Sequence, residues 1–402
     1  MVNRIVFVER ASLHLHYPQQ YGVDSLRAAG LDVEVLQLAS LMTGATCPTP
    51  AQRMNSGVAV REIRSYSELS AELERLCKDS VFIDHISGLS DLDLDTHRIF
   101  RLFQRHRLKY FVVYIGGLPS PQRRGERWRR LLNPRAVYRF AAKQCIGVLN
   151  RYTTMYSRPE RIFAVDCEAV SNYMFRYHIP AERLVRCHSA DYERYLAFQR
   201  SGGIPHPAGR GACVFLDDAM THHPDFETLR IPSLPEAAYF RTMNRFFDAL
   251  EERTGLRLVI AAHPRSRYEE RPQAFGDRPI VHGKTLELVA GAALVVVHCS
   301  TSVNFAVICN RPVVVVKTAE MSNHIIGSFV DAVAASLGTR AYDIDQPGVL
   351  DAIPYPWAIN SVAYDHYRYS YIMSRDVDDV SIWELMIGEL TDENGSSSER
   401  AS

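Results

Sequence analysis

The stretch of chain from residue 256 to residue 317 constrains the fold most. It contains three short apolar runs, at residues 256–262, 293–297 and 312–316, with helical patterns between them. Val- and Ile-rich runs of about four to eight residues are typical of buried strands in a parallel sheet, where helices cover both faces. This stretch therefore predicts a doubly wound α/β domain.

Two of these runs end directly in polar residues. His263 and Arg265 follow the first run, and Ser300, Thr301 and Ser302 follow the second. The carboxyl ends of parallel strands meet at one edge of the sheet, where α/β proteins bind ligands. We also expect the Ser-Thr-Ser cluster to open a helix whose free N–H groups attract an anion. Hydroxyls, an imidazole and a guanidinium together predict a phosphate site. A core histidine with satisfied hydrogen bonds is the alternative for His263 taken alone.

The rest of the chain repeats the alternation of strands and helices. Further strands are expected at residues 4–8, 32–38, 58–63, 81–86, 110–115, 161–165, 184–187 and 212–216. The sequence SGGIPHPAGRG at residues 201–211 is typical of a linker. We therefore predict an N-terminal Rossmann-like domain (1–200), a linker (201–211), a C-terminal Rossmann-like domain (212–355), terminal helices (356–390) and a disordered tail (391–402). A cleft between two such domains is the expected ligand site.

Composition and missing motifs exclude several classes of protein. Lys plus Arg equals Asp plus Glu at 46 each, so no net charge draws the chain to nucleic acid. Neither a GxGxxG loop nor a P-loop is present, and the histidines and eight cysteines lack metal-ligand spacing. No apolar run has the length of a membrane span or signal peptide. The expectation is a cytoplasmic protein that uses no metal or other cofactor.

An arginine-rich stretch at residues 119–143 carries Arg123, Arg124 and Arg127 among interleaved apolar residues. Such a pattern suits a basic amphipathic surface that contacts anionic lipid or an anionic glycan acceptor. A solvated helix with local ion pairs is the alternative.

A second polar group lies at the start of another expected helix. Glu287, just after Lys284 and Thr285, can accept hydrogen bonds from ribose hydroxyls. Lys284 would give a diphosphate donor a second cation beside Arg265.

Three of these segments together resemble the GT-B glycosyltransferases that use CMP-activated sugars. They are His263-Pro264, the sequence TLELV at residues 285–289, and Ser300-Thr301-Ser302. In that family the His-Pro and Ser/Thr motifs hold the CMP phosphate. The sequence FLDDAMTHHPDF at 215–226 looks most like the retaining β-Kdo transferases of bacterial surface polysaccharide synthesis. The likeness covers residues 160–320. Asp166-Cys167-Glu168 lacks the glycine of the sialyltransferase acidic motif, so that base is not indicated.

The resemblance implies transfer of Kdo from CMP-Kdo to a glycan or lipid-linked glycan, with retention, in lipopolysaccharide O-antigen or capsule synthesis. Retention by double displacement needs a carboxylate nucleophile. Asp217 is the first candidate and Asp225 the second, while Asp218 is expected to point the opposite way from Asp217. Capping of the following helix is the alternative for these acids. Glu168 is the candidate acid/base, and a peripheral contact with the inner membrane is expected.

Two alternatives to this function remain open. One is a GT-B enzyme with another donor, such as CMP-sialic acid, a UDP-sugar or a CDP-polyol. The other is a non-catalytic module that binds an anionic glycan through the arginine-rich stretch.

Overall fold

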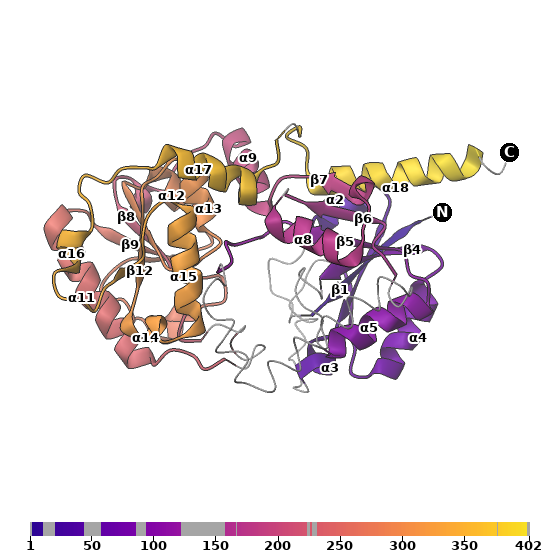
Figure 1. Ribbon diagram of the computed structural model, residues 1–402, viewed down its shortest axis with the longest axis horizontal. Helices are drawn as coiled ribbons and strands as arrows, with labels where there is room; N and C mark the ends of the chain where they lie inside the picture. Colours follow the sequence, from indigo (N-terminus) through magenta and orange to yellow (C-terminus); the bar gives the residue numbers. More distant parts are fainter. Residues whose placement is uncertain are drawn as a thin grey trace. The chain divides into compact units, whose positions relative to one another are not determined.

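The chain folds into two compact units, seen in Figure 1. The computed structural model describes residues 2–10, 21–43, 58–85, 94–121, 157–165, 167–222, 226, 231–375 and 377–399. Unit 1 holds Met1–Ile115, Arg124–His188 and Ser374–Ser402, and unit 2 holds Gly116–Arg123 and Ser189–Met373. The division thus differs from the expected boundary near residue 200, because α9 (Ala190–Arg200) packs on the core of unit 2 through Tyr192, Tyr195 and Phe198.

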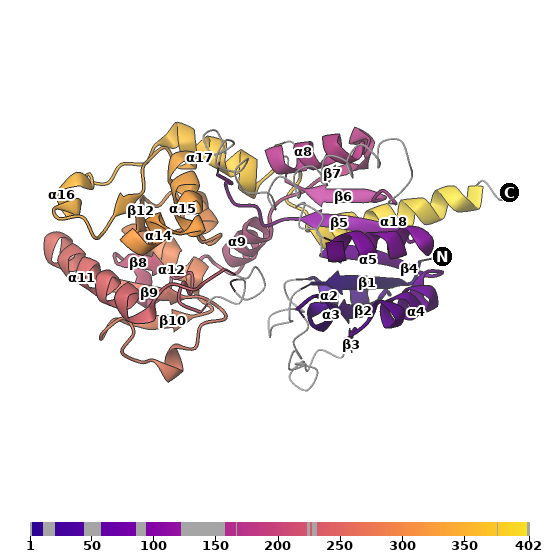
Figure 2. The ribbon, with the colours of Figure 1, turned by 60° about the horizontal axis from the view of Figure 1, so that its bottom comes forward.

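The described strands of unit 1 form a parallel sheet in the order β3-β2-β1-β4-β5-β6-β7, and Figure 2 shows them side by side. Their bounds are β1 Arg4–Glu9, β2 Asp32–Gln37, β3 Ala59–Glu62, β4 Ser80–His85, β5 Tyr110–Tyr114, β6 Arg161–Ala164 and β7 Leu184–Arg186. Every strand expected in this half of the chain is confirmed, with ends that differ by at most one residue.

Alternation along the strands divides the apolar side chains of unit 1 between two faces. One face packs on α4 (Tyr66–Leu76), α5 (Leu94–Arg105) and α8 (Glu168–Tyr177). The other face packs on α2 (Val23–Ala28) and α18 (Ile382–Glu399), where Trp383 and Met386 are buried. The short helices α3 (Ala39–Thr43) and η2 (Ala181–Arg183) also belong to unit 1. The last helix of the chain is therefore part of the N-terminal fold.

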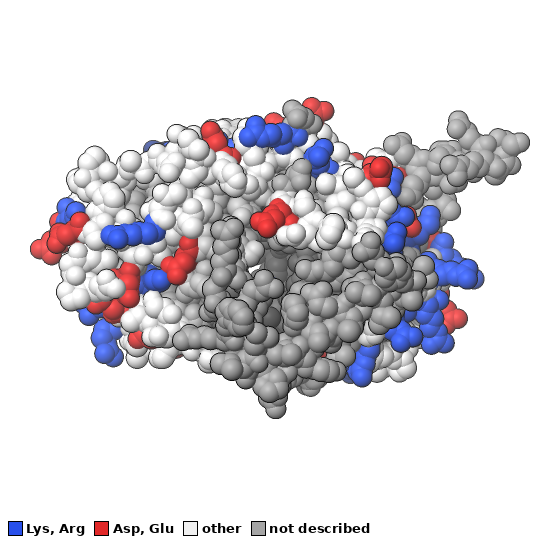
Figure 3. All heavy atoms as spheres, in the orientation of Figure 1, with Lys and Arg blue, Asp and Glu red and all other residues white. Residues whose placement is uncertain are grey.

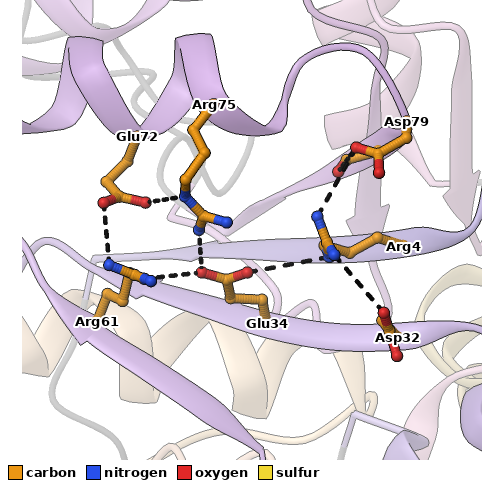
Figure 4. Close-up of polar contacts among 8 residues, drawn as sticks. Arg4, Asp32, Glu34, Arg61, Glu72, Arg75 and Asp79 are labelled. Carbon is orange, nitrogen blue, oxygen red and sulfur yellow. Dashed lines mark hydrogen bonds and ion pairs between the residues drawn. The ribbon is translucent and has the colours of Figure 1, made fainter.

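A network of ion pairs ties β1, β2 and β3 to α4, as Figure 4 shows. Its centre is the Glu34 carboxylate, which has 9% side-chain exposure and lies 3.0 Å from Arg61 Nε and 4.0 Å from Arg4 Nε. Arg75 of α4 reaches the same carboxylate. A buried carboxylate is tolerated only when it is paired, so these three arginines explain why a strand buried on both faces carries Glu34.

Unit 2 contains a second parallel sheet, in the order β10-β9-β8-β11-β12-β13. Its strands are β8 Cys213–Leu216, β9 Leu258–Ala262, β10 Ile280–His282, β11 Leu294–Val297, β12 Val313–Lys317 and β13 Tyr342–Asp343. Its other helices are η3 Pro207–Gly209, α11 Glu236–Thr254, η4 Tyr268–Glu270, α12 Thr285–Gly291, α13 Val303–Ile308, α14 Ala319–Ser322, α15 Ile325–Ser336, α16 Val349–Ala352, α17 Ser361–Tyr367 and η5 Arg368–Ile372. The expected strands at 212–216, 256–262, 293–297 and 312–316 are confirmed, and together these elements enclose one apolar core.

The Pro- and Gly-rich segment at 201–211 is packed against the body of unit 2. His206 N–H donates to the Glu287 carbonyl at 2.9 Å, and Gly211 N–H donates to Gly291 O at 2.9 Å. A Cβ at Gly209 would lie 2.4 Å from Leu288 O, so glycine is needed there for a close backbone approach. The segment is thus a fixed connection inside unit 2 and not the joint between the units.

The end of the chain differs from the tail expected from residue 391. The helix α18 begins at Ile382, whose side chain is buried, and continues to Glu399. Packing of Ile382, Trp383 and Met386 nucleates this helix, and extending a nucleated helix costs much less than starting one. No helix in the described part of the chain is long and apolar enough to cross a membrane.

Basic side chains gather on the exposed face of α5. Arg98, Arg101 and Arg105 share one face of this helix and are exposed. Arg98 lies 3.8 Å from Asp95, whereas Arg101 and Arg105 have no carboxylate partner among the described residues. Figure 3 shows blue spheres concentrated on the side of unit 1 where Figure 1 draws α4 and α5.

Candidate functional site

The strand order of unit 2 singles out one position on its sheet. From β8 the chain proceeds to β9 and β10 on one side, and then to β11, β12 and β13 on the other. The strand order therefore reverses between β8 and β11, and ligands of open α/β sheets bind beside the carboxyl ends of strands at such a switch point. The polar residues predicted after β8, β9 and β11 all lie at this edge.

Asp217 directly follows β8 and is buried, with 3% exposure. Its Oδ1 accepts from Ala219 N–H at 3.0 Å. Its Oδ2 accepts from His263 N–H at 3.2 Å and from the Tyr268 hydroxyl at 2.8 Å. Burial raises the pKa of Asp217, and these hydrogen bonds oppose that rise. Asp217 therefore holds the loop after β9 in place, and both of its oxygens are already engaged.

Asp218 reaches toward the opposite neighbour, β11. Its Oδ2 accepts from Cys299 N–H at 3.0 Å, and the nearby Ser300 side chain acts to lower the pKa of this acid. Burial raises the pKa of Asp218 to about 7, with a smaller contribution from the negative charge of Asp217. The two adjacent acids point apart, as expected, and Asp218 is the one that contacts the Ser-Thr-Ser cluster.

His263 is partly buried, and its hydrogen bonds fix its tautomer. Arg265 N–H donates to His263 Nδ1 at 3.2 Å. Because Nδ1 accepts, the proton of the neutral ring sits on Nε2, which is therefore a donor. Ser266 Oγ donates to the His263 carbonyl at 2.7 Å and closes the turn that carries Arg265. This turn presents an imidazole N–H and a guanidinium on one short loop.

The Ser-Thr-Ser cluster differs in one respect from its expected role. The N–H groups of Val303, Asn304 and Phe305 donate to the carbonyls of Ser300, Thr301 and Ser302, at 3.1, 3.0 and 3.1 Å. Ser302 N–H points to Ser300 Oγ at 3.4 Å. The prediction of free N–H groups at the start of α13 is therefore wrong, because these groups donate to carbonyls within a tight turn. The hydroxyls of the cluster remain as its donors.

The other predicted residues lie elsewhere or outside the described chain. Lys284 Nζ is 3.0 Å from Glu287 Oε1, and both flank Thr285 at the start of α12, after the edge strand β10. No hydrogen bond or ion pair among the described residues joins this trio to Asp218. Glu168 is the exposed first residue of α8 in unit 1. Asp225, Arg123, Arg124 and Arg127 lie outside the described residues.

A buried polar chain behind the cluster was not predicted. Asn304 of α13 donates from Nδ2 to Asp191 Oδ2 at 2.9 Å, and Tyr367 donates its hydroxyl to Asn304 Oδ1 at 3.0 Å. Burial raises the pKa of Asp191. A polar residue, Asn304, in the otherwise apolar sequence VNFAVI was the available signal. This chain fixes α13 and, through it, the position of Ser302.

His298 follows β11 but belongs to the core. It is fully buried, with Nδ1 2.6 Å from Val316 O and Nε2 3.1 Å from the Tyr239 hydroxyl. Burial lowers the pKa of His298 to about 4, so the ring is neutral. Among the described residues no cluster of three or more His, Cys, Asp or Glu could hold a metal ion, and transfer without a metal stays a prediction.

Comparison with known proteins gives a fold. No protein-family model and no curated protein matches the sequence. Two solved glycosyltransferases are similar in structure. The kitacinnamycin glycosyltransferase has a TM-score of 0.50 at 15% identity, over 91% of this chain and 93% of that one. The calicheamicin glycosyltransferase CalG4 has a TM-score of 0.50 at 14% identity, over 100% of both chains.

A UDP-GlcNAc 2-epimerase from Neisseria meningitidis, bound to UDP-GlcNAc, has a TM-score of 0.46 at 11% identity, over 98% of this chain and 100% of that chain. At such identities a likeness concerns the fold alone. With two Rossmann-like units and parallel sheets in both, the chain has the GT-B fold.

Proposed function

We propose that this protein is a glycosyltransferase that transfers Kdo from CMP-Kdo to a glycan acceptor with retention of configuration. One observation carries the proposal: Asp217 and Asp218 tie the ends of β9 and β11 to β8, so that the loop carrying His263 and a buried acid share one switch point. The resemblance of the His263 and Ser300 motifs to CMP-sugar transferases gives the donor.

The donor phosphate would be held by neutral and cationic donors. His263 Nε2–H, the Arg265 guanidinium and the hydroxyls of Ser300, Thr301 and Ser302 suit the oxygens of a single phosphate. Lys284 and Glu287 are paired with each other, which leaves the ribose as their proposed partner and not the phosphate.

For the reaction we favour Asp218 over Asp217, because the oxygens of Asp217 already accept three hydrogen bonds. In the first step an Asp218 oxygen bonds to the anomeric carbon of Kdo, and the bond from that carbon to the phosphate oxygen breaks, releasing CMP. In the second step the acceptor oxygen bonds to the anomeric carbon, the bond from that carbon to Asp218 breaks, and the acceptor proton passes to the candidate base. Asp225 remains the second candidate nucleophile and Glu168 the candidate acid/base.

Donor turnover tests this function directly. Protein incubated with CMP-Kdo should release CMP and, with an acceptor glycan, form a product with the anomeric configuration of the donor by NMR. A product of inverted configuration would contradict the double-displacement mechanism. Absence of CMP release, with and without lipopolysaccharide-derived glycans, would remove the donor assignment.

The proposal includes a peripheral contact with an anionic membrane. The exposed face of α5 offers Arg101 and Arg105, and the stretch with Arg123, Arg124 and Arg127 is a second basic segment. Each Lys or Arg near an anionic surface contributes about 1 kcal/mol. Changing Arg101 and Arg105 to Glu should therefore reduce sedimentation with phosphatidylglycerol vesicles by roughly tenfold or more.

The control for this experiment changes Arg210 and Arg241, which are exposed in unit 2, to Glu. A parallel variant changes Arg123, Arg124 and Arg127 to Glu, to compare the two basic segments. Equal sedimentation of all variants and of the parent protein would mean that neither basic segment binds the membrane.

A further inference from the structure

The sheet of unit 1 has its own switch point, and three polar side chains occupy it. The strand order reverses between β1 and β4, which are neighbours in the sheet. Glu9 ends β1, Gln37 ends β2 and His85 ends β4, and the register pairs Glu9 with both of the others. Side chains in register on parallel strands share a face, so these three form one row across the carboxyl ends of the strands.

This row interrupts an otherwise apolar face. The residues two positions earlier on the same strands are Phe7, Val35 and Ile83, and all three are fully buried. Glu9 has 7% exposure, Gln37 has none and the His85 side chain has 12%. Polar groups at the end of a buried face lose hydration and need partners. Each of these three side chains therefore needs a hydrogen-bond partner that offsets its lost hydration.

Glu9 and His85 are hydrogen-bond partners of each other. His85 Nδ1 lies 3.2 Å from Glu9 Oε2, and the Tyr21 hydroxyl donates to the same oxygen at 3.4 Å. The carboxylate is an acceptor, so Nδ1 carries the proton and Nε2 of the neutral ring is left as an acceptor. The Tyr21 and His85 rings lie 4.6 Å apart between centroids. The pair thus holds an imidazole with a proton-accepting nitrogen in a fixed orientation.

The burial of the polar Gln37 side chain is not offset by any hydrogen bond in the described part of the chain. Neither its Oε1 nor its Nε2 has a hydrogen-bond partner among the described residues, although both atoms are buried. An amide left without partners destabilises a folded protein, and buried polar groups are almost always satisfied. Gln37 lies beside Glu9 at a switch point, where α/β proteins bind ligands. A bound ligand is therefore the expected hydrogen-bond partner of its amide.

We propose that Glu9, Gln37 and His85 form a second ligand site, for a neutral saccharide that presents hydroxyl groups. The three side chains bring a carboxylate, an amide and an imidazole but no Lys or Arg, so they match hydroxyls better than phosphate or carboxylate groups. Gln37 can both donate to and accept from adjacent hydroxyls.

The test combines a stability measurement with a binding measurement. Gln37→Leu has nearly the same volume but no polar atoms. It should raise the thermal midpoint and lower affinity for N-acetylglucosamine and methyl β-galactopyranoside, measured by saturation-transfer NMR, by about tenfold or more. Glu9→Gln should lower the same affinity. Ser80→Ala, at a buried polar position at the amino end of β4, is the control and should leave sugar binding unchanged.

Three results would overturn the site: no saturation transfer to either sugar in the parent protein, unchanged transfer in Gln37→Leu, or a lowered midpoint in Gln37→Leu. The last would mean that a bound water satisfies the amide. Calorimetry with CMP separates this site from the donor site. If sugar binding is lost while CMP binding is normal, only the proposed saccharide site is contradicted. If CMP binding is absent while sugar binding is normal, only the proposed donor is contradicted.

Discussion

Replacing Asp218 with Asn is expected to stop transfer from CMP-Kdo while CMP binding persists and the folded protein becomes more stable at pH 8. Activity is lost because the amide cannot act as the nucleophile. Stability rises because burial raises the pKa of Asp218 to about 7, so ionisation of this group opposes folding at pH 8. Intact-mass spectrometry should show a sugar adduct on the parent protein and none on Asp218→Asn.

The stability difference should depend on pH in a defined direction. The pKa of Asp218 is about 7 in the folded protein, against 3.8 as the ordinary value. Between these two values the folded state keeps a proton that the unfolded state has lost, so the parent protein loses stability as pH rises. Above pH 7 the full cost is present, up to about 4 kcal/mol. Asp218→Asn should therefore match the parent protein near pH 4 and exceed its stability by the largest margin above pH 7.

Asp217→Asn is the matched control for this prediction. Asp217 accepts from His263 N–H and from Tyr268, so an amide at this position loosens the loop that carries His263. We expect weaker CMP binding but continued adduct formation on Asp218. If Asp217→Asn abolishes the adduct and Asp218→Asn does not, Asp217 is the nucleophile. An adduct on Asp225 would instead move the role to that residue.

The second large effect is expected from His263→Ala. Its Nε2–H is the proposed donor to the CMP phosphate, and a hydrogen bond to a charged group contributes about 1.5–3 kcal/mol. Calorimetry should therefore show CMP binding weakened roughly 10- to 150-fold. The fold should survive, because the bond from Asp217 reaches the backbone N–H of this residue and not its side chain.

The matched control is His282→Ala. His282 is an exposed histidine at the end of the neighbouring strand β10, paired at 3.5 Å with Glu269. It should leave CMP affinity unchanged. Equal CMP affinity in His263→Ala and the parent protein would mean that the phosphate lies elsewhere.

Sequence patterns predicted the central strands of both sheets because those strands are apolar on both faces. They did not predict β10 and β13, which are edge strands of three and two residues. A run of two or three residues is a weak strand signal, although the equally short β7 was predicted. Such strands form because a neighbouring strand offers unpaired N–H and C=O groups. The α/β class could therefore be predicted, but not the full width of the second sheet.

The unit boundary and the details of the site depend on tertiary contacts that no local pattern contains. Residues 201–211 have the composition of a linker, yet the close approach of Gly209 to Leu288 places them inside unit 2. Likewise, strand alternation predicted that Asp217 and Asp218 point apart, but only the bonds to His263 and Cys299 distinguish their roles. Gln37 looked like the end of a strand, and its importance follows from burial without a partner.

The most direct test of the central claim is calorimetric titration of the parent protein with CMP and, separately, with UDP. The proposed site offers hydroxyls, the His263 imidazole N–H and Arg265 to a single phosphate, which suits CMP. We predict saturable CMP binding that His263→Ala weakens, and no detectable UDP binding. Binding of UDP in preference to CMP, or of neither nucleotide, would contradict a CMP-sugar transferase.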